Sequence, residues 1–304
     1  MEISILLAEQ ILAMFLTMAV GFGVVRGGLF KTEDSRIISN MVVYICNPCV
    51  VVHSFQIELT DDKIKGLMIA IGLSVVVHMV LIIGSEILSF IFHFNSIEKA
   101  SIIYTNAGYL VIPLVGAVLG EEWVFYTTAF ILVQTVLMWT HGVKLIGQEK
   151  DLNIRKILCN PNVIAMIIGI ALFALEIRLP PVVDSCVSGF GDMISPASMM
   201  VIGMVIGDVD LKWVFRQKRP YLICLLRLIV FPLIAVVAFA GLERSGIHPD
   251  AEYILMIVLI ATSAPAAAMI TQLAQIYGKD SRYASVINVM SVIFCIITMP
   301  VMVL

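Results

Sequence analysis

Ten long apolar runs, separated by short polar connections, constrain this chain more than any other feature of its sequence. Hydrophobic residues make up 60% of the 304 residues and charged residues only 13%, whereas a soluble domain has about 25% charged residues. A helix needs ~20 apolar residues to cross a bilayer. The sequence therefore predicts an all-α polytopic membrane protein with ten transmembrane helices. We expect them at residues 5–25, 36–57, 67–92, 99–120, 123–146, 161–177, 184–207, 218–241, 252–277 and 283–304.

The distribution of basic residues predicts the orientation of these helices. Of the 19 Lys and Arg residues, 14 lie in the first, third, fifth, seventh and ninth connections, four lie in the others and one lies within a run. Basic residues accumulate in cytoplasmic loops. We therefore expect the odd connections in the cytoplasm, both termini outside it, and the protein in the cell membrane. The net charge of −3 gives no reason to expect nucleic acid as a partner.

The basic segment 148–160 divides the chain into two halves of five helices each, 1–147 and 161–304. With an odd number of helices, the halves must have opposite topology, as in transporters built from inverted repeats. The fourth run reads TNAGYLVIPLVGAVLG (105–120), and the ninth reads TSAPAAAMITQLAQIYG (262–278). The halves also match at the fifth and tenth runs, where Gln134 and Asn288 lie 154 residues apart.

Two prolines in these matching runs, Pro113 and Pro265, predict interrupted helices. A proline inside a helix removes a backbone donor and clashes with the preceding turn. In a membrane, unwound backbone is tolerated only where it is buried in protein or lines a cavity. The sequence therefore predicts a substrate site at the two breaks, and the alternative is a pair of merely kinked helices. The further candidate site residues are Asn47, Thr105, Asn106, Gly108, Gln134, Thr262, Ser263 and Asn288.

Arg227 is the most deeply placed charge, about nine residues or ~13 Å into its span. Such a residue is a functional-site hypothesis, and we expect it to bind an anionic substrate. The alternatives are a snorkelling side chain, or a structural contact with Glu86 or a helix carbonyl. His78 and Glu86 are candidates for proton coupling, although His78 can equally be a neutral packing residue.

The motifs of membrane enzymes are incomplete in this chain. The string GFGD at 189–192 fits intramembrane aspartyl proteases, but no second aspartate stands on a neighbouring helix to share a proton with Asp192. The CxxC string at 46–49 lies inside an apolar run, outside any thioredoxin-like context. We therefore expect neither an enzyme nor a cofactor or metal site.

The segment TNAGYLVIPLVGAVLG resembles the fourth helix of the auxin efflux carrier family, which includes plant PIN-type carriers and prokaryotic dicarboxylate (malonate- and malate-type) permeases. The segments ISPASMMVIGMVIG, LLRLIVFP, APAAAMITQLAQIYG and SVINVMSVIFCIITMPVMVL resemble its seventh to tenth helices. The resemblance implies that helices 4 and 9 are broken and cross near the midplane, as in bile acid:sodium symporters and NhaA-like proteins. It also implies a scaffold part, a transport part and a homodimer.

This chain departs from the family pattern in two ways. Members commonly have an asparagine shortly after the ninth-helix proline, where this sequence reads Pro265-Ala266-Ala267-Ala268-Met269. The long loop of plant PIN carriers is also missing, which favours a prokaryotic-type carrier. We expect a secondary transporter that moves a small organic anion, a mono- or dicarboxylate, by alternating access, with H⁺ or Na⁺ as the coupling ion. The alternative is an ion channel or membrane receptor on the same scaffold.

Overall fold

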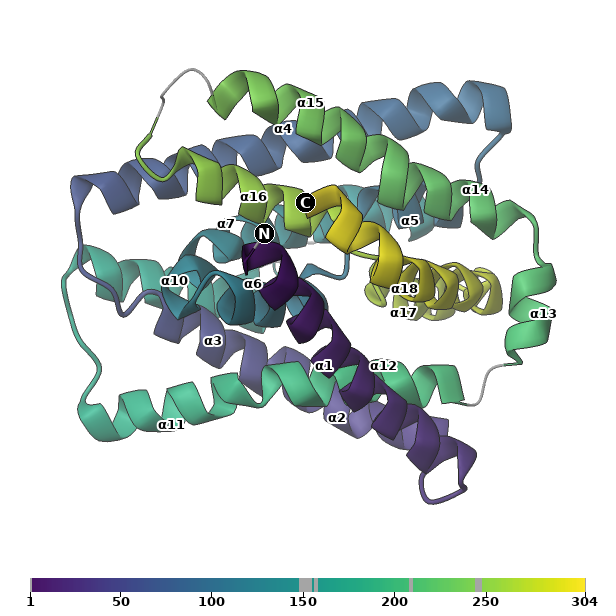
Figure 1. Ribbon diagram of the computed structural model, residues 1–304, viewed down its shortest axis with the longest axis horizontal. Coiled ribbons are helices and arrows are strands. Elements are labelled where there is room, and N and C mark those ends of the chain that lie inside the picture. Colours follow the sequence, from purple (N-terminus) through teal and green to yellow (C-terminus); the bar gives the residue numbers. More distant parts are fainter. Residues whose placement is uncertain (1, 148–154, 156–157, 208–209, 244–247, 304) are drawn as a thin grey trace. The chain divides into compact units, whose positions relative to one another are not determined.

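The computed structural model describes residues 2–147, 155, 158–207, 210–243 and 248–303. Helices dominate the described residues (Figure 1). A single isolated β-bridge is the sole extended pairing found among them. The all-α prediction is confirmed for this part of the chain. Most of the predicted linker 148–160 lies outside the described residues.

Six helical segments among the described residues are long and apolar enough to cross a membrane. They are Thr32–Ser54, Asp61–Phe92, Glu121–Gly147, Pro181–Gly207, Arg219–Phe239 and Ser281–Met302, and shorter apolar helices cover Leu16–Arg26, Pro161–Ala174 and Ala251–Ser263. These segments overlap nine of the ten expected runs, although the helix in the ninth run, 252–277, ends at Ser263. The fourth expected run, 99–120, is divided between shorter helices, and the count of ten spans stays a prediction.

The chain forms two compact units, and each takes segments from both predicted halves. The first comprises Met1–Ile64, Gly108–Thr128 and Leu158–Leu211, and the second comprises Lys65–Ala107, Ala129–Ile157 and Lys212–Leu304. This division follows contacts in space, whereas the predicted repeats 1–147 and 161–304 follow the chain. The inverted repeat therefore stays a prediction.

The first unit contains α1 (Glu2–Arg26), η1 (Thr32–Asp34), α2 (Ser35–Met41), η2 (Val42–Cys46), α3 (Asn47–Ser54), α6 (Ile112–Val118), η4 (Glu121–Trp123), α10 (Pro161–Ala174), α11 (Pro181–Asp192) and α12 (Ile194–Gly207). Helices α1 and α12 pack closely against each other. A Cβ atom on Gly203 would collide with the carbonyl oxygen of Met18, and one on Gly21 with that of Met200. Small residues allow this close approach, as is common between membrane helices.

The second unit contains most of α4 (Asp61–Phe92), then α5 (Ser96–Ile103), η5 (Met138–Gly142), α8 (Val143–Gly147), α13 (Leu211–Arg216), α14 (Arg219–Leu225), η6 (Leu226–Val230), α15 (Phe231–Glu243), α16 (Ala251–Ser263), α17 (Met269–Ile276) and α18 (Ser281–Val303). Besides α4 and α13, which each begin in the first unit, two elements cross from one unit to the other along the chain: η3 (Ala107–Val111) and α7 (Val124–Leu137). With 32 residues, α4 is about 48 Å long at 1.5 Å per residue, longer than a hydrocarbon core of about 30 Å.

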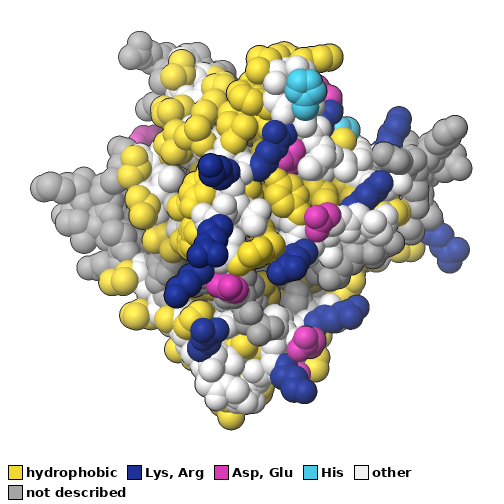
Figure 2. Space-filling model, turned by 90° about the vertical axis from the view of Figure 1, so that its right-hand side faces the viewer, with side chains coloured by type: hydrophobic (Ala, Val, Ile, Leu, Met, Phe, Trp, Pro, Cys, Tyr) yellow, Lys and Arg dark blue, Asp and Glu magenta, His cyan; other side chains and the backbone are white. Residues whose placement is uncertain are grey.

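Large apolar side chains cover much of the exposed surface of the helices. Phe90 is 84% exposed, Val182 82% and Val237 75%. Figure 2 shows one face on which Lys and Arg side chains project between hydrophobic ones. Exposed apolar surface of this extent is unfavourable in water and is typical of helices that contact lipid.

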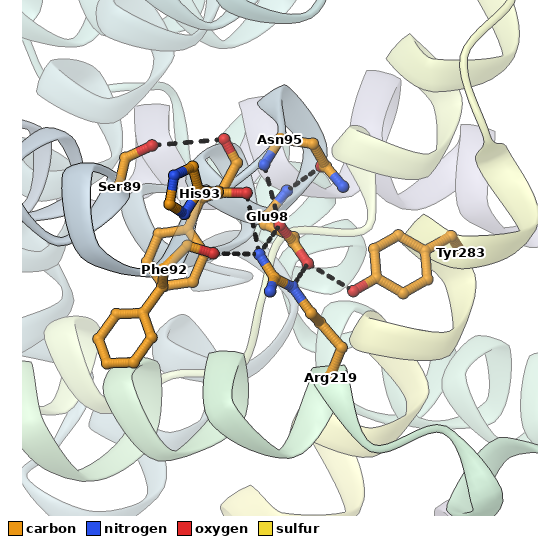
Figure 3. A network of polar contacts seen from close by, with 8 residues as sticks. Ser89, Phe92, His93, Asn95, Glu98, Arg219 and Tyr283 are labelled. Atoms are coloured by element: carbon orange, nitrogen blue, oxygen red, sulfur yellow. Dashed lines mark hydrogen bonds and ion pairs between the residues drawn. The ribbon is translucent and has the colours of Figure 1, made fainter.

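A polar network in the second unit joins the starts of α5, α14 and α18 to the end of α4 (Figure 3). The Glu98 carboxylate accepts hydrogen bonds from Arg219 Nε at 2.7 Å, from the Tyr283 hydroxyl at 2.7 Å and from the Asn95 backbone N–H at 2.9 Å. Arg219 Nη2 also donates to the carbonyl oxygens of Phe92 and His93, at 2.6 and 3.0 Å. The network holds four helix ends together through one buried carboxylate.

Candidate functional site: the paired helix breaks

Each of the two proline-containing runs is interrupted by an extended segment. In the fourth run, α5 ends at Ile103, Tyr104 is extended, and the chain becomes helical again at Ala107. In the ninth run, α16 ends at Ser263, Ala264 is extended, and α17 begins at Met269. Pro265 lies inside the second break. Pro113 instead lies in α6 (Ile112–Val118), which continues directly from the π-helical turn η3, and not in the first break.

The two extended segments pair with each other inside the second unit. Thr105 and Ala266 form an antiparallel bridge. The Asn106 N–H donates to the Pro265 carbonyl at 2.8 Å, and the Ala267 N–H donates to the Tyr104 carbonyl at 3.0 Å. Backbone groups that the breaks remove from the helices are thereby satisfied by protein, as a bilayer requires. Thr105 and Asn106 are both buried.

Gln134, from α7, completes the hydrogen bonds of the first extended segment. Its Oε1 accepts from the Thr105 backbone N–H at 2.8 Å and from the Thr105 hydroxyl at 3.0 Å. Its Nε2 donates to the Thr105 carbonyl at 2.9 Å. The Gln134 amide therefore satisfies both backbone groups of Thr105, as a neighbouring β-strand would.

Asn288 and Ser291, from α18, have the same role for the second segment. Asn288 Nδ2 donates to the Ala266 carbonyl at 2.7 Å, and the Ser291 hydroxyl accepts from the Ala266 N–H at 3.0 Å. The sequence analysis missed Ser291. Its position three residues after Asn288, on the same helix face, is the signal that could have identified it. Direct contact of Gln134 or Asn288 with a substrate stays a prediction.

Arg227 lies in the π-helical turn η6 and is fully buried. Its Nε donates to the Ala264 carbonyl at 3.2 Å, and its Nη1 donates to the Ile102 carbonyl at 3.0 Å. Its Nη2 has no partner among the described residues. Arg227 thus makes contacts with helix carbonyls, as expected if its role is structural. Its contact with a substrate stays a prediction.

The remaining candidates of the second unit lie near the ends of helices or inside them. The Thr262 hydroxyl donates to the Val258 carbonyl at 2.6 Å, whereas the buried Ser263 hydroxyl has no partner among the described residues. Glu86 is paired with Lys99 at 2.7 Å. His78 is fully buried, packs on Phe130 with ring centroids 4.8 Å apart, and bonds the Ser74 carbonyl through Nδ1 at 2.7 Å. This nitrogen must carry the proton, because a carbonyl only accepts.

Three candidates belong to the first unit: Asn47, Gly108 and Pro113. Asn47 is buried, and its Oδ1 has no partner among the described residues. A Cβ atom on Gly108 would lie 3.1 Å from Asn47 Nδ2, so the absence of a side chain leaves room for this amide. Pro113 lines a cavity of about 240 Å³ together with His53, Ser54, Glu121, Asp192 and further residues.

The described residues contain four π-helical turns, each next to a candidate residue or a helix break. Turn η2 precedes Asn47, η3 follows the first break, and η6 carries Arg227. Turn η5 carries His141, whose Nδ1 lies 2.9 Å from the hydroxyl of Tyr104. Such turns are frequent at functional sites, because the wider turn redirects side chains and frees carbonyls.

Comparison with known proteins agrees with this geometry. A family model described as membrane transport protein matches residues 6–156 and 150–303, nearly the whole chain. The chain belongs to the auxin efflux carrier family of membrane transport proteins. No curated protein matches the chain. Family membership and the apolar helices together show a multi-pass membrane transport protein, with a small molecule as substrate and the lipid bilayer as its surroundings.

Both family matches include a helix break. The first covers Tyr104–Asn106, and the second covers Ala264–Ala267. Because the chain belongs to a transporter family, transport is the activity to which these helix breaks have to be related.

Proposed function

We propose that this auxin efflux carrier family member is a secondary transporter that moves a small organic anion, a mono- or dicarboxylate, by alternating access around the paired helix breaks. The observation that carries the proposal is the antiparallel pairing of residues 104–106 with 265–267. Broken helices at corresponding places in two halves are typical substrate and ion sites of secondary transporters. We also propose that the protein lies in the cell membrane and that both of its termini are outside the cytoplasm.

The charge around the breaks favours an anion. Arg227 brings a positive charge within hydrogen-bonding distance of both interrupted helices. None of the ion pairs among the described residues includes it. The amino end of α17 follows the second break, and helix amino ends favour negative groups. We propose Thr105, Asn106, Thr262, Ser263 and Pro265, all in the second unit, as substrate-facing residues. A role in binding for Asn47, Gly108 and Pro113 stays a prediction.

The two compact units suggest a division of labour. We propose that the second unit, which contains the paired breaks, is the transport part, and that the first unit is the scaffold and forms the homodimer. The close packing of α1 against α12 in the first unit supports a rigid role. Coupling to H⁺ or Na⁺, with His78 and Glu86 as the candidates for protons, belongs to the same proposal.

Uptake into proteoliposomes tests the function directly. Labelled mono- and dicarboxylates are offered one at a time, with pH, Na⁺ and voltage gradients imposed separately. We expect saturable uptake of at least one carboxylate that depends on one of these gradients. Currents in planar bilayers far above carrier turnover would contradict the carrier and favour the channel.

Asn106→Ala is expected to weaken binding of the transported anion about 5- to 150-fold, because unpaired buried partners cost about 1–3 kcal/mol. The thermal midpoint without substrate should change little, because the backbone bond from Asn106 to Pro265 does not need the side chain. Ser263→Ala, which removes a hydroxyl that makes fewer bonds, is the matched variant and should have the smaller effect. Unchanged affinity in Asn106→Ala would remove this residue from the site.

Orientation is tested with single cysteines in a cysteine-free background. A cysteine in place of Lys212 should be shielded from impermeant thiol reagents in intact cells, whereas one in place of Arg178 should react. This follows from the cytoplasmic excess of basic residues. The reverse pattern would contradict the proposed orientation.

A further inference from the structure

Arg227 carries a buried charge without an acidic partner among the described residues. Its side chain is fully buried, and the ion pairs of the described residues join other groups: His53 with Asp184, Lys99 with Glu86 and Arg219 with Glu98. An isolated buried charge is strongly unfavourable. Some other negative group must therefore compensate the guanidinium.

Two helix ends provide this compensation. The carbonyl that accepts from Nη1 belongs to Ile102, in the last turn of α5, and the one that accepts from Nε belongs to Ala264, directly after α16. The carboxyl end of a helix carries about half a unit of negative charge. Two such ends together offset part of the charge of the guanidinium, and its planar fork of donors can bond both.

We propose that Arg227 is a positioning residue, the resident cation of the paired breaks. It fixes the carboxyl ends of α5 and α16, and thereby the extended residues 104–106 and 264–267 that follow them. Carboxyl ends of broken helices are places where transporters bind inorganic cations. Here the guanidinium occupies that place, so neither helix end requires Na⁺. Arg227 then acts on the anion through the backbone of the breaks, and this part of the inference rests on the proposed function.

Thermal unfolding of the purified protein tests the positioning role without any transport assay. Arg227→Gln removes the charge, and we expect the midpoint to fall by about 5–10 °C. Arg227→Lys retains the charge and should recover part of this loss. Arg227→Ala should be stabilised by guanidinium at concentrations well below denaturing ones, because the free ion can bind both carbonyls. Arg36→Ala, at an exposed arginine, is the control and should gain nothing.

Uptake measurements test the consequence for the substrate. In Arg227→Lys, uptake should persist with a KM raised about tenfold, and in the wild type it should be unchanged when Na⁺ is replaced by a large organic cation. Hydrogen exchange on Arg227→Lys should show faster exchange of the Asn106 and Ala267 amides than in the wild type. This measurement keeps the inference testable if the Gln and Ala variants do not fold.

Two results would overturn the positioning role. One is Arg227→Gln with the wild-type midpoint and a selective loss of anion binding, which would place the guanidinium on the substrate itself. The other is unchanged exchange at Asn106 and Ala267 in Arg227→Lys together with no effect of guanidinium on Arg227→Ala. Uptake that requires Na⁺ would overturn the proposal that the Arg227 guanidinium takes the place of a bound cation at the helix ends. If thermal rescue is observed but no carboxylate is taken up by the wild type, the proposed function fails and the positioning role stands.

Discussion

Replacing Gln134 with leucine is expected to lower the free energy of unfolding by about 3 kcal/mol and to reduce transport at least tenfold. The substitution keeps the size of the side chain but removes all three hydrogen bonds to Thr105. A buried polar group left without a partner costs about 1–3 kcal/mol. In this variant both the N–H and the carbonyl of Thr105 would lose their partner. Transport should suffer because the segment that pairs with Ala266 is no longer fixed.

Thermal midpoints and initial uptake rates of three variants check this expectation. Asn288→Leu should have a smaller effect, because Ser291 still accepts from the Ala266 N–H. Thr140→Val is the control, since among the described residues its hydroxyl bonds only the carbonyls of Val136 and Leu137 in the preceding turn. If Gln134→Leu keeps the wild-type midpoint and rate, the amide does not support the crossing segments.

The second large effect is expected at Glu98. Glu98→Gln should lower the free energy of unfolding by about 2–3 kcal/mol, because hydrogen bonds to a charged group contribute about 1.5–3 kcal/mol and the Arg219 guanidinium loses its carboxylate. Tyr283→Phe removes one donor from the same carboxylate and should cost about 1 kcal/mol. Equal midpoints for Glu98→Gln and the wild type would show that the network in Figure 3 does not stabilise the fold.

The same network predicts how stability depends on pH. Burial by itself raises the pKa of Glu98, but the hydrogen bonds from Arg219, Tyr283 and Asn95 outweigh it and hold this pKa below its usual range. A carboxyl group with a lowered pKa stabilises the folded state at pH values above its unfolded pKa of about 4.3. This contribution is lost as the pH falls through the lower folded pKa. The midpoint of Glu98→Gln should therefore change less than that of the wild type between pH 6 and pH 3, as differential scanning fluorimetry over this range would show.

The membrane class could be predicted from the sequence because hydrocarbon imposes a strict requirement on each spanning segment. An apolar run of about 20 residues has few alternatives to a helix in lipid. The helical segments accordingly coincide with the expected runs along most of the chain. The fourth run was the least predictable, since its path changes from α5 through an extended stretch to η3 and α6.

Pro113 illustrates the limit of local reasoning about breaks. A proline disfavours the turn before it, yet the first break lies at residues 104–106, ahead of the intervening π-helical turn η3. The place of the break is decided by partners far along the chain, namely Gln134 and the segment around Ala266. A local rule identifies the run that breaks, whereas tertiary hydrogen bonds select the residues.

By itself, the sequence determined that the chain is an apolar helical membrane protein, that two of its runs contain an internal proline, and that Gln134, Asn288 and Arg227 are unusual for lipid surroundings. Periodicity, charge and spacing are local properties, so they can be read without coordinates. Only the tertiary structure decided that Thr105 pairs with Ala266, and that the Arg227 donors bond the carbonyls of Ile102 and Ala264. These partners lie more than 30 residues apart, and their pairing depends on how the helices pack, because a buried backbone group accepts whichever donor the packing brings within reach.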